Sequence, residues 1–234
     1  MSAVSIKNIR KAHGDRVVLD GVNLEIEAGE FVSIVGQSGC GKSTLLNCVA
    51  GFLPCDGTIT GPKRIGFVFQ DYSLYPFMTC HENVALGLAH LGNGQRQKRV
   101  AEYMEIIGLP DYGGRYPWQL SGGESQRVAV ARAFAPEPDV VLLDEPLSAL
   151  DVMRRESMLE WLMDFLRNRQ TTCLMVTHWI DEAILPADRV VVLGGGTVRA
   201  EFAVSLPRPR EDHTKTRPEF ASLREDIRDC IFKP

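Results

Sequence analysis

The sequence predicts an α/β fold in which a mostly parallel sheet is flanked by helices, with an N-terminal antiparallel β layer and an inserted helical subdomain. Three observations support this prediction. Short, nearly continuous apolar runs, typical of strands buried on both faces, begin at Phe31, Val140, Thr171 and Arg189. Residues 4–30 alternate between polar and apolar and carry Gly-Asp and Asp-Gly turn signals. From Tyr72 to Ala135 helix-forming segments are interrupted by glycine and proline.

The order of these elements gives a domain plan. Residues 151–169 place apolar side chains at helical spacing after Asp151, a good N-cap residue, and predict a crossover helix. We expect an α/β core with its β layer over residues 1–71 and 135–204. The helical subdomain is expected over 72–134, and a tail rich in proline and charge, with a short terminal helix, over 205–234.

The composition is that of an ordinary soluble globular protein. The 234 residues include 44% hydrophobic residues and carry a net charge of −4, which argues against a basic nucleic-acid face. Six scattered cysteines form no C-x-x-C pair, so we expect reduced thiols rather than a zinc site or disulfides. The longest apolar runs are too short to cross a bilayer, and we expect a cytosolic chain.

The stretch GQSGCGKS matches the pattern G-x-x-x-x-G-K-[ST], and it lies between an apolar strand and a helical segment. Glycines let such a loop curl so that its N–H groups and the helix N-terminus face a phosphate chain. We expect Lys42 to reach the β- and γ-phosphates, Ser43 to bind Mg²⁺ and Thr44 to contact the α-phosphate. The alternative is a glycine turn with a surface lysine. The expected nucleotide-binding residues are Gly36, Gln37, Ser38, Gly39, Cys40, Gly41, Lys42, Ser43 and Thr44.

An acidic pair closes the next buried strand. Carboxylates at the C-terminal end of a strand face the crevice in which ligands bind in parallel sheets. Asp144 is the candidate Mg²⁺ ligand, and Glu145 is the candidate for polarising the attacking water. A solvated acidic turn is the alternative. Together with the glycine loop, the pair predicts a P-loop NTPase core.

These motifs resemble, in their order, those of the ATP-binding subunits of ABC transporters. The chain also has Gln70 after an apolar strand, LSGGE at residues 120–124, SALD at residues 148–151, and His178 in LMVTHWIDEA. The resemblance implies that Gln70 contacts Mg²⁺ and water, and that His178 contacts the γ-phosphate. It makes Lys42, Gln70, Glu145 and His178 the expected catalytic residues.

In that family two subunits pair head to tail, and each ATP lies between the P-loop of one and the LSGGE signature of the other. Here Ser121 and Glu124 form a capping-box pattern, so a helix is expected to begin there, with Gly122 and Gly123 allowing close approach to the γ-phosphate. A capping box without a ligand is the alternative. Ser148 and Asp151 are expected to lie at the same dimer interface.

Two positions depart from the family pattern or carry distinctive chemistry. His13 stands where the family usually has an aromatic residue that stacks on adenine; it is either a stacking imidazole or a surface residue. Cys40 lies in the P-loop, where we expect the helix N-terminus to lower its pKa. N-ethylmaleimide is then expected to inactivate the enzyme and ATP to protect it.

The resemblance also implies partners. The aromatics of residues 72–77 either dock an integral membrane permease, at the cytoplasmic face of the inner membrane, or pack inside the helical insertion. An extracytoplasmic solute-binding protein would be an indirect partner. YPWQLSGG and RPEFASLREDI resemble importers of nitrate, sulfonates, taurine and vitamin precursors.

Two alternatives to a transport ATPase are kept. In DNA-repair and chromosome-organising ATPases a long insert separates the two halves of the site, whereas here only residues 44–119 lie between them, without heptads. A nonhydrolytic interaction protein would not need Lys42, Glu145 and His178. We therefore expect a transport ATPase that uses ATP and Mg²⁺ and does not bind nucleic acid.

Overall fold

The computed structural model describes residues 2–167, 169 and 171–233. The chain forms two compact units, one of Met1–Lys63 with Gln170–Pro234 and one of Arg64–Arg169. The first unit contains the glycine loop and both ends of the chain, and the second contains the signature and the acidic pair.

An antiparallel sheet lies at the N-terminal end of the first unit, in the order β2 (Arg16–Glu27), β1 (Ser2–His13) and β4 (Asp56–Thr60). The alternating pattern of the sequence buries one face of the hairpin: Val4 and Ile6 are buried, as are Leu24 and Ile26 opposite them. This is the predicted β layer.

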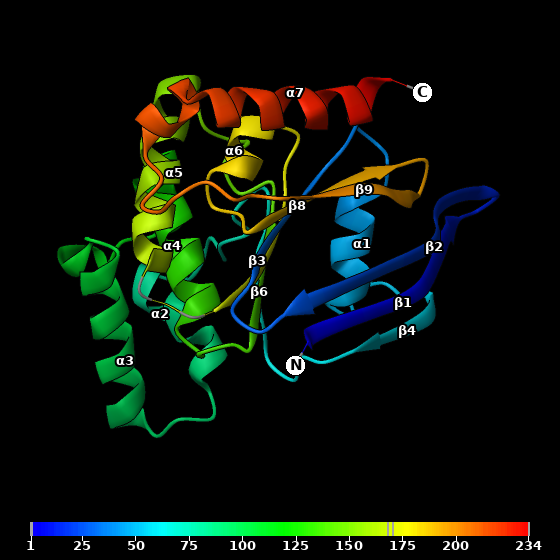
Figure 1. Cartoon of the computed structure of the whole chain (residues 1–234). Helices are drawn as coiled ribbons and strands as arrows, with labels where there is room; N and C mark the ends of the chain where they lie inside the picture. The colour runs from blue at the N-terminus through cyan, green and yellow to red at the C-terminus, as the bar shows by residue number, and fades with distance from the viewer. Residues whose placement is uncertain (1, 168, 170, 234) are drawn as a thin grey trace. The chain divides into compact units, whose positions relative to one another are not determined.

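Four further strands of the first unit belong to the central sheet, in the order β7 (Thr172–Val176), β3 (Phe31–Val35), β8 (Arg189–Gly194) and β9 (Thr197–Ala203). The first three run parallel, and β9 returns antiparallel beside β8. The helices of this unit are α1 (Lys42–Val49), α6 (Ile180–Ile184) and α7 (Pro218–Phe232) (Figure 1). The strands β3 and β7 are buried at every position, as their continuous apolar runs predict.

The second unit pairs β5 (Ile65–Val68) with β6 (Val140–Asp144) in parallel. Its helices are α2 (Cys80–Ala85), α3 (Asn93–Ile106), α4 (Gly122–Phe134) and α5 (Val152–Arg167) (Figure 1). The rings of Phe134 in α4 and Phe165 in α5 meet edge to face at 5.0 Å, inside the core of this unit.

The predicted fold class is confirmed, and so are the capping residues. Asp151 Oδ1 accepts a hydrogen bond from the backbone N–H of Arg154 at 3.1 Å, at the start of α5. The expected terminal helix is present as α7 and begins at Pro218, because proline suits the first helical position. Within the described residues, every helix is too short or too polar to span a bilayer.

Candidate functional site

The glycine loop connects β3 to α1 through residues 36–41, in the order strand, loop and helix that the motif requires. Gly39 and Gly41 adopt φ of 75° and 107°, a left-handed conformation that residues with a side chain rarely adopt. A Cβ on Gly41 would lie 2.8 Å from Leu19 Cδ2 and 2.9 Å from the carbonyl oxygen of Val18. The curl of the loop therefore depends on glycine at these positions.

The helix that follows offers an anion site. Gly41 is the N-cap residue of α1, and as a glycine it places no capping side chain over the first-turn N–H groups. Those N–H groups and the helix dipole favour a bound anion. Ser43 and Thr44, both half-buried, lie in this first turn. This donor set fits the phosphate chain of a nucleotide.

Lys42 completes the loop. Its side chain is only 5% exposed, and its Nζ donates to the carbonyl oxygens of Gly36 at 2.9 Å and Gln37 at 3.1 Å. These two bonds hold the ammonium group across the loop, where its charge complements a phosphate.

His178 lies two residues after the end of β7, the strand next to β3. The strands β3 and β7 are parallel neighbours with Ile34 opposite Val176, so the loop and the segment after β7 start at the same sheet edge. The backbone there is fixed, because Thr177 Oγ1 accepts from Trp179 N at 3.1 Å and donates to Glu182 Oε2 at 3.0 Å. The His178 side chain is exposed.

His13 ends β1 opposite Arg16, at the tip of the hairpin, and its side chain is exposed. Its role in stacking on a base stays a prediction.

The acidic pair lies in the second unit. Asp144 is the last residue of β6 and is 8% exposed. Gln70 lies two residues after the end of β5, the strand that pairs with β6, and its side chain is exposed. Glu145 has φ of 42°, in the left-handed region, which costs a residue with a Cβ about 1–2 kcal/mol. Such strain is typical of functional sites. Ser148 stabilises the turn, because its N–H and Oγ both donate to the Glu145 carbonyl oxygen, at 3.1 and 2.8 Å.

The signature forms the predicted capping box at the start of α4. Ser121 N donates to Glu124 Oε2 at 2.7 Å, and Glu124 N donates to Ser121 Oγ at 3.3 Å. The bond from the Ser121 backbone holds the pKa of the Glu124 carboxyl below its usual value. Gly122 and Gly123 are half-buried beside Leu150 and Met158.

Cys40 differs from the sequence prediction. Burial raises the pKa of its thiol above the ordinary 9.0, although Lys42 and Arg199 act in the opposite direction. Removal from water therefore outweighs the nearby positive charge, and the predicted lowering of its pKa is wrong.

Arg132 is a residue that the sequence reasoning missed. Its guanidinium donates to the carbonyl oxygens of Tyr72 at 2.7 Å and Ser73 at 2.6 Å. Both residues have positive φ, 62° and 43°, so the cation holds a strained turn. Of the predicted aromatics, Tyr75 and Phe77 are 46% and 68% exposed, whereas Tyr72 is half-buried. An arginine inside the apolar helical run VAVARAF was the available signal.

A groove of about 510 Å³ lies against this turn, all of it within the second unit. It is lined by Phe69, Ser73, Leu74, Tyr75, Pro76 and Arg132.

Comparisons with known proteins agree with these motifs. The family described as ABC transporter matches residues 19–148. The aliphatic sulfonates import ATP-binding protein SsuB 1 of Agrobacterium fabrum is 40% identical, over 98% of this chain and 84% of its own. The nitrate import ATP-binding protein NrtD of Synechocystis is 42% identical, over 92% of this chain and 88% of its own.

A third relative is longer than this chain. The bicarbonate transport ATP-binding protein CmpC of Synechococcus elongatus is 42% identical over 96% of this chain, which spans only 37% of the length of that relative.

The solved structures give the same assignment. The dimeric post-hydrolysis structure of the ATP-binding cassette MJ0796, bound to ADP and Pi, has a TM-score of 0.76 and 34% identity. The similarity covers 87% of this chain and 100% of the MJ0796 chain. The chain therefore belongs to the ABC transporter family.

Proposed function

We propose that this chain binds and hydrolyses Mg-ATP as the motor subunit of an ABC importer for a small anion. The observation that carries the proposal is the loop 36–41, whose left-handed glycines lead into α1 with a glycine, which has no capping side chain, at the N-cap. Lys42, held across that loop by two carbonyl groups, adds the positive charge.

The proposed roles follow the chemistry of each side chain. Lys42 binds the β- and γ-phosphates, Thr44 binds the α-phosphate, and His178 donates a hydrogen bond to the γ-phosphate. Ser43, Gln70 and Asp144 are the proposed Mg²⁺ ligands, since hydroxyl, amide and carboxylate oxygens suit this ion. When bound, Mg²⁺ neutralises charge that develops on the phosphate oxygens.

Glu145 is proposed to orient and polarise the attacking water. Its positive φ is maintained by the two bonds from Ser148 to its carbonyl oxygen, which fixes the backbone from which the carboxylate extends. A catalytic group held in one conformation loses less entropy when the water binds.

The signature is proposed to bind the ATP of a second copy. Helix α4 begins directly after Ser121, which forms the capping box with Glu124. Its first two residues, Gly122 and Gly123, have no side chain, so a phosphate can approach the positive end of the helix dipole closely. Two dimeric structural neighbours, one of them bound to ADP and Pi, support a dimer. The proposed pair is head to tail, with Asp151 at its interface. The subunit would close on ATP and reopen after hydrolysis.

The groove beside Arg132 is proposed to dock a cytoplasmic helix of the permease. Exposed Tyr75 and Phe77 supply apolar contact area, and the Arg132 clamp keeps the turn in shape. This docking would place the chain at the cytoplasmic face of the inner membrane, with an extracytoplasmic solute-binding protein as an indirect partner.

The class of solute is proposed from relatives, whose printed names specify bicarbonate, nitrate and aliphatic sulfonates. These solutes share small size and negative charge, so the proposed solute is a small anion. A non-transport ABC ATPase is the alternative, and it gains no support from those names.

The test is the oligomeric state of Glu145→Gln, measured by light scattering with and without Mg-ATP. We expect ATP-dependent dimers, because the variant binds ATP and does not turn it over. Ser121→Arg in the same background should abolish the dimer, since it places a cation and bulk at the signature. An ATP-dependent dimer that survives Ser121→Arg would contradict the composite site, and absence of ATP binding would contradict the function.

A further inference from the structure

The C-terminal segment of the chain packs against α6 and contacts the P-loop, both in the first unit. After β9 the chain runs through residues 204–217 and continues as α7, which packs against α6 and β8 (Figure 1). Phe220 and Ile227 of α7 are fully buried, so the helix is part of the core of this unit. Its contacts reach the P-loop, through Gln37, and α6, which begins two residues after His178.

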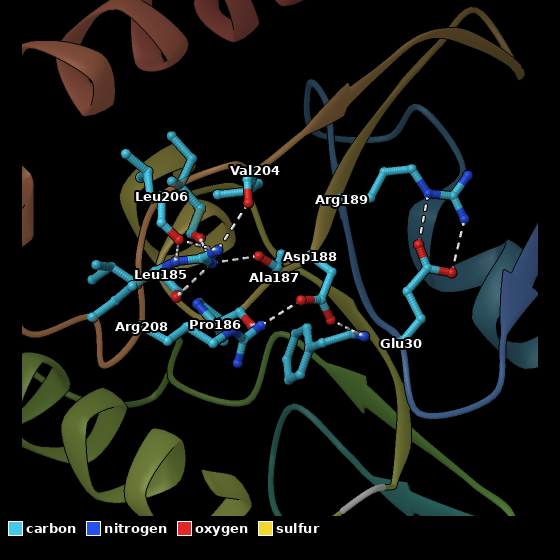
Figure 2. Close-up of polar contacts among 12 residues, drawn as sticks. Glu30, Leu185, Pro186, Ala187, Asp188, Arg189, Val204, Leu206 and Arg208 are labelled. Atoms are coloured by element: carbon cyan, nitrogen blue, oxygen red, sulfur yellow. Dashed lines mark hydrogen bonds and ion pairs between the residues drawn. The ribbon is translucent and has the colours of Figure 1, made fainter.

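The segment before α7 is anchored to the end of α6 by Arg210. This residue is 6% exposed, and its guanidinium donates to the carbonyl oxygens of Ile184 and Leu185, both at 3.3 Å. It also donates to the carbonyl oxygen of Val204 at 2.9 Å. Figure 2 labels Leu185, Val204 and Leu206, which are among the residues whose carbonyl oxygens accept from it. Burial lowers the pKa of this guanidinium to about 10, so the cation is retained at neutral pH. The C-terminal end of α6 is therefore held by the tail.

The other end of α6 is held by α7 itself. Arg224 Nε and Nη2 donate to the two carboxylate oxygens of Asp181 at 2.6 and 2.8 Å, a bidentate pair that is about two-thirds buried. Asp181 lies in the first turn of α6, three residues after His178. The backbone that presents His178 is thus fixed at both ends of α6 by the C-terminal segment.

The last turn of α7 reaches the P-loop. Gln37 Nε2 donates to the carbonyl oxygen of Ile231 at 3.1 Å, and Arg199 Nη1 donates to that of Cys230 at 3.4 Å. The final carbonyl groups of a helix have no partner within the helix, so these two bonds satisfy groups that need one. A small cavity of about 70 Å³ lies between them, beside Cys40.

We propose that α7 is a positioning element of the nucleotide site, with Gln37 and Arg224 as its positioning residues. Gln37 ties the second residue of the P-loop to the last turn of α7, and Arg224 ties α6 to the same helix. The inference rests on the proposed function of the P-loop and His178.

The physical consequence is a smaller ordering cost when ATP binds. A P-loop held at Gln37 already has the curvature that the phosphates need, whereas a released loop must be ordered by the ligand. One hydrogen bond of this kind is worth about 1 kcal/mol, which corresponds to a roughly fivefold change in Kd. Releasing Asp181 would instead misplace His178 and affect the chemical step.

The first test uses Gln37→Leu, which keeps the side-chain size and removes the amide. We expect the Kd for a fluorescent ATP analogue to rise roughly three- to tenfold, with KM for ATP rising more than kcat falls. Arg228→Met is the matched control, because this α7 residue pairs with Glu225 at the surface. We expect it to bind the analogue as the wild type does.

A double-mutant cycle separates the α7 bond from a direct contact with nucleotide. A chain that ends at Asp229 lacks the carbonyl groups of Cys230 and Ile231, so adding Gln37→Leu to it should cause no further loss of affinity for the analogue. A chain that ends at Phe232 keeps both carbonyl groups and is the control. Additive losses, or an unchanged Kd in Gln37→Leu alone, would overturn the role of Gln37. If the shortened chain fails to melt cooperatively, Gln37→Asn in the full chain replaces it: this variant keeps the amide but is one methylene too short to reach the Ile231 carbonyl oxygen, so it should bind the analogue as weakly as Gln37→Leu.

The second test uses Arg224→Met and Arg224→Lys. We expect Arg224→Met to lower kcat roughly tenfold with a smaller change in KM, and Arg224→Lys to restore part of the rate. Equal kcat in Arg224→Met and wild type would overturn this arm. A wild-type chain that does not bind the analogue would contradict the proposed function itself, whereas normal wild-type binding with unaffected variants would contradict only the inference about α7.

Discussion

Replacing Gly36 by alanine tests the P-loop most directly. A Cβ at this position would lie 2.2 Å from the carbonyl oxygen of Leu193 and 2.8 Å from Cys40 Sγ. Carbon and oxygen atoms normally approach to about 3.3–3.6 Å, so the start of the loop must move by about 1 Å away from β8. Overpacking of this kind costs about 1–3 kcal/mol of unfolding free energy.

The effect on nucleotide binding should exceed the effect on folding. A displacement of about 1 Å in a positioned group is worth about a hundredfold in function. We expect Gly36→Ala to fold, to unfold at a lower urea concentration, and to bind the fluorescent ATP analogue at least roughly tenfold more weakly.

Gly51→Ala is the matched control in the same unit. Gly51 has φ of 75°, and a Cβ there would meet no atom within 4 Å. This variant should lose about 1–2 kcal/mol of stability from the left-handed conformation and keep its affinity for ATP. Wild-type affinity in Gly36→Ala, measured by equilibrium titration, would refute the close approach to β8.

Three further predictions concern other contacts. Because burial raises the pKa of the Cys40 thiol above its ordinary value, the rate of its reaction with N-ethylmaleimide should keep rising as the pH is raised beyond neutrality, with ATP slowing it. A plateau of this rate near neutral pH would contradict the raised pKa. Arg132→Met leaves the carbonyl groups of Tyr72 and Ser73 without their donor, so it should lower the free energy of unfolding in urea by about 1–3 kcal/mol. We also expect it to abolish stimulation of the ATPase activity by the permease; unchanged stimulation would rule out a role of Arg132 in docking. Glu124→Ala should cost about 1 kcal/mol, because it removes the carboxylate that accepts from the Ser121 backbone N–H. Since this bond lowers the folded pKa of Glu124, its contribution is present above about pH 4.5 and lost as pH falls through the folded pKa, so a variant that is equally destabilised well below that pH would contradict the assignment.

Much of the site was predictable because its signals are local. The P-loop glycines, Lys42 and the capping box of Ser121 with Glu124 depend on backbone geometry within a few residues, and the sequence states those residues directly. The buried strands could also be recognised in the sequence. A continuous apolar run such as FVSIV avoids water when both faces of the strand are covered, as they are in a parallel sheet.

The contacts that the sequence reasoning missed join residues far apart in the chain. Arg132 holds Tyr72 and Ser73 across some sixty positions, and nothing near Arg132 specifies its partners. The pKa of Cys40 was predicted in the wrong direction, because the sequence shows the nearby helix start and does not show how much of the thiol is removed from water.

The sequence by itself determined the fold class, the strand order along the chain, the P-loop, the acidic pair and the signature, because each is encoded by short-range spacing and backbone preference. Only the tertiary structure decided that Gln37 bonds to the carbonyl group of Ile231 and that Arg224 pairs with Asp181. Those contacts arise when α7 buries Phe220 and Ile227, and burial of apolar surface does not specify in advance which polar groups it brings together.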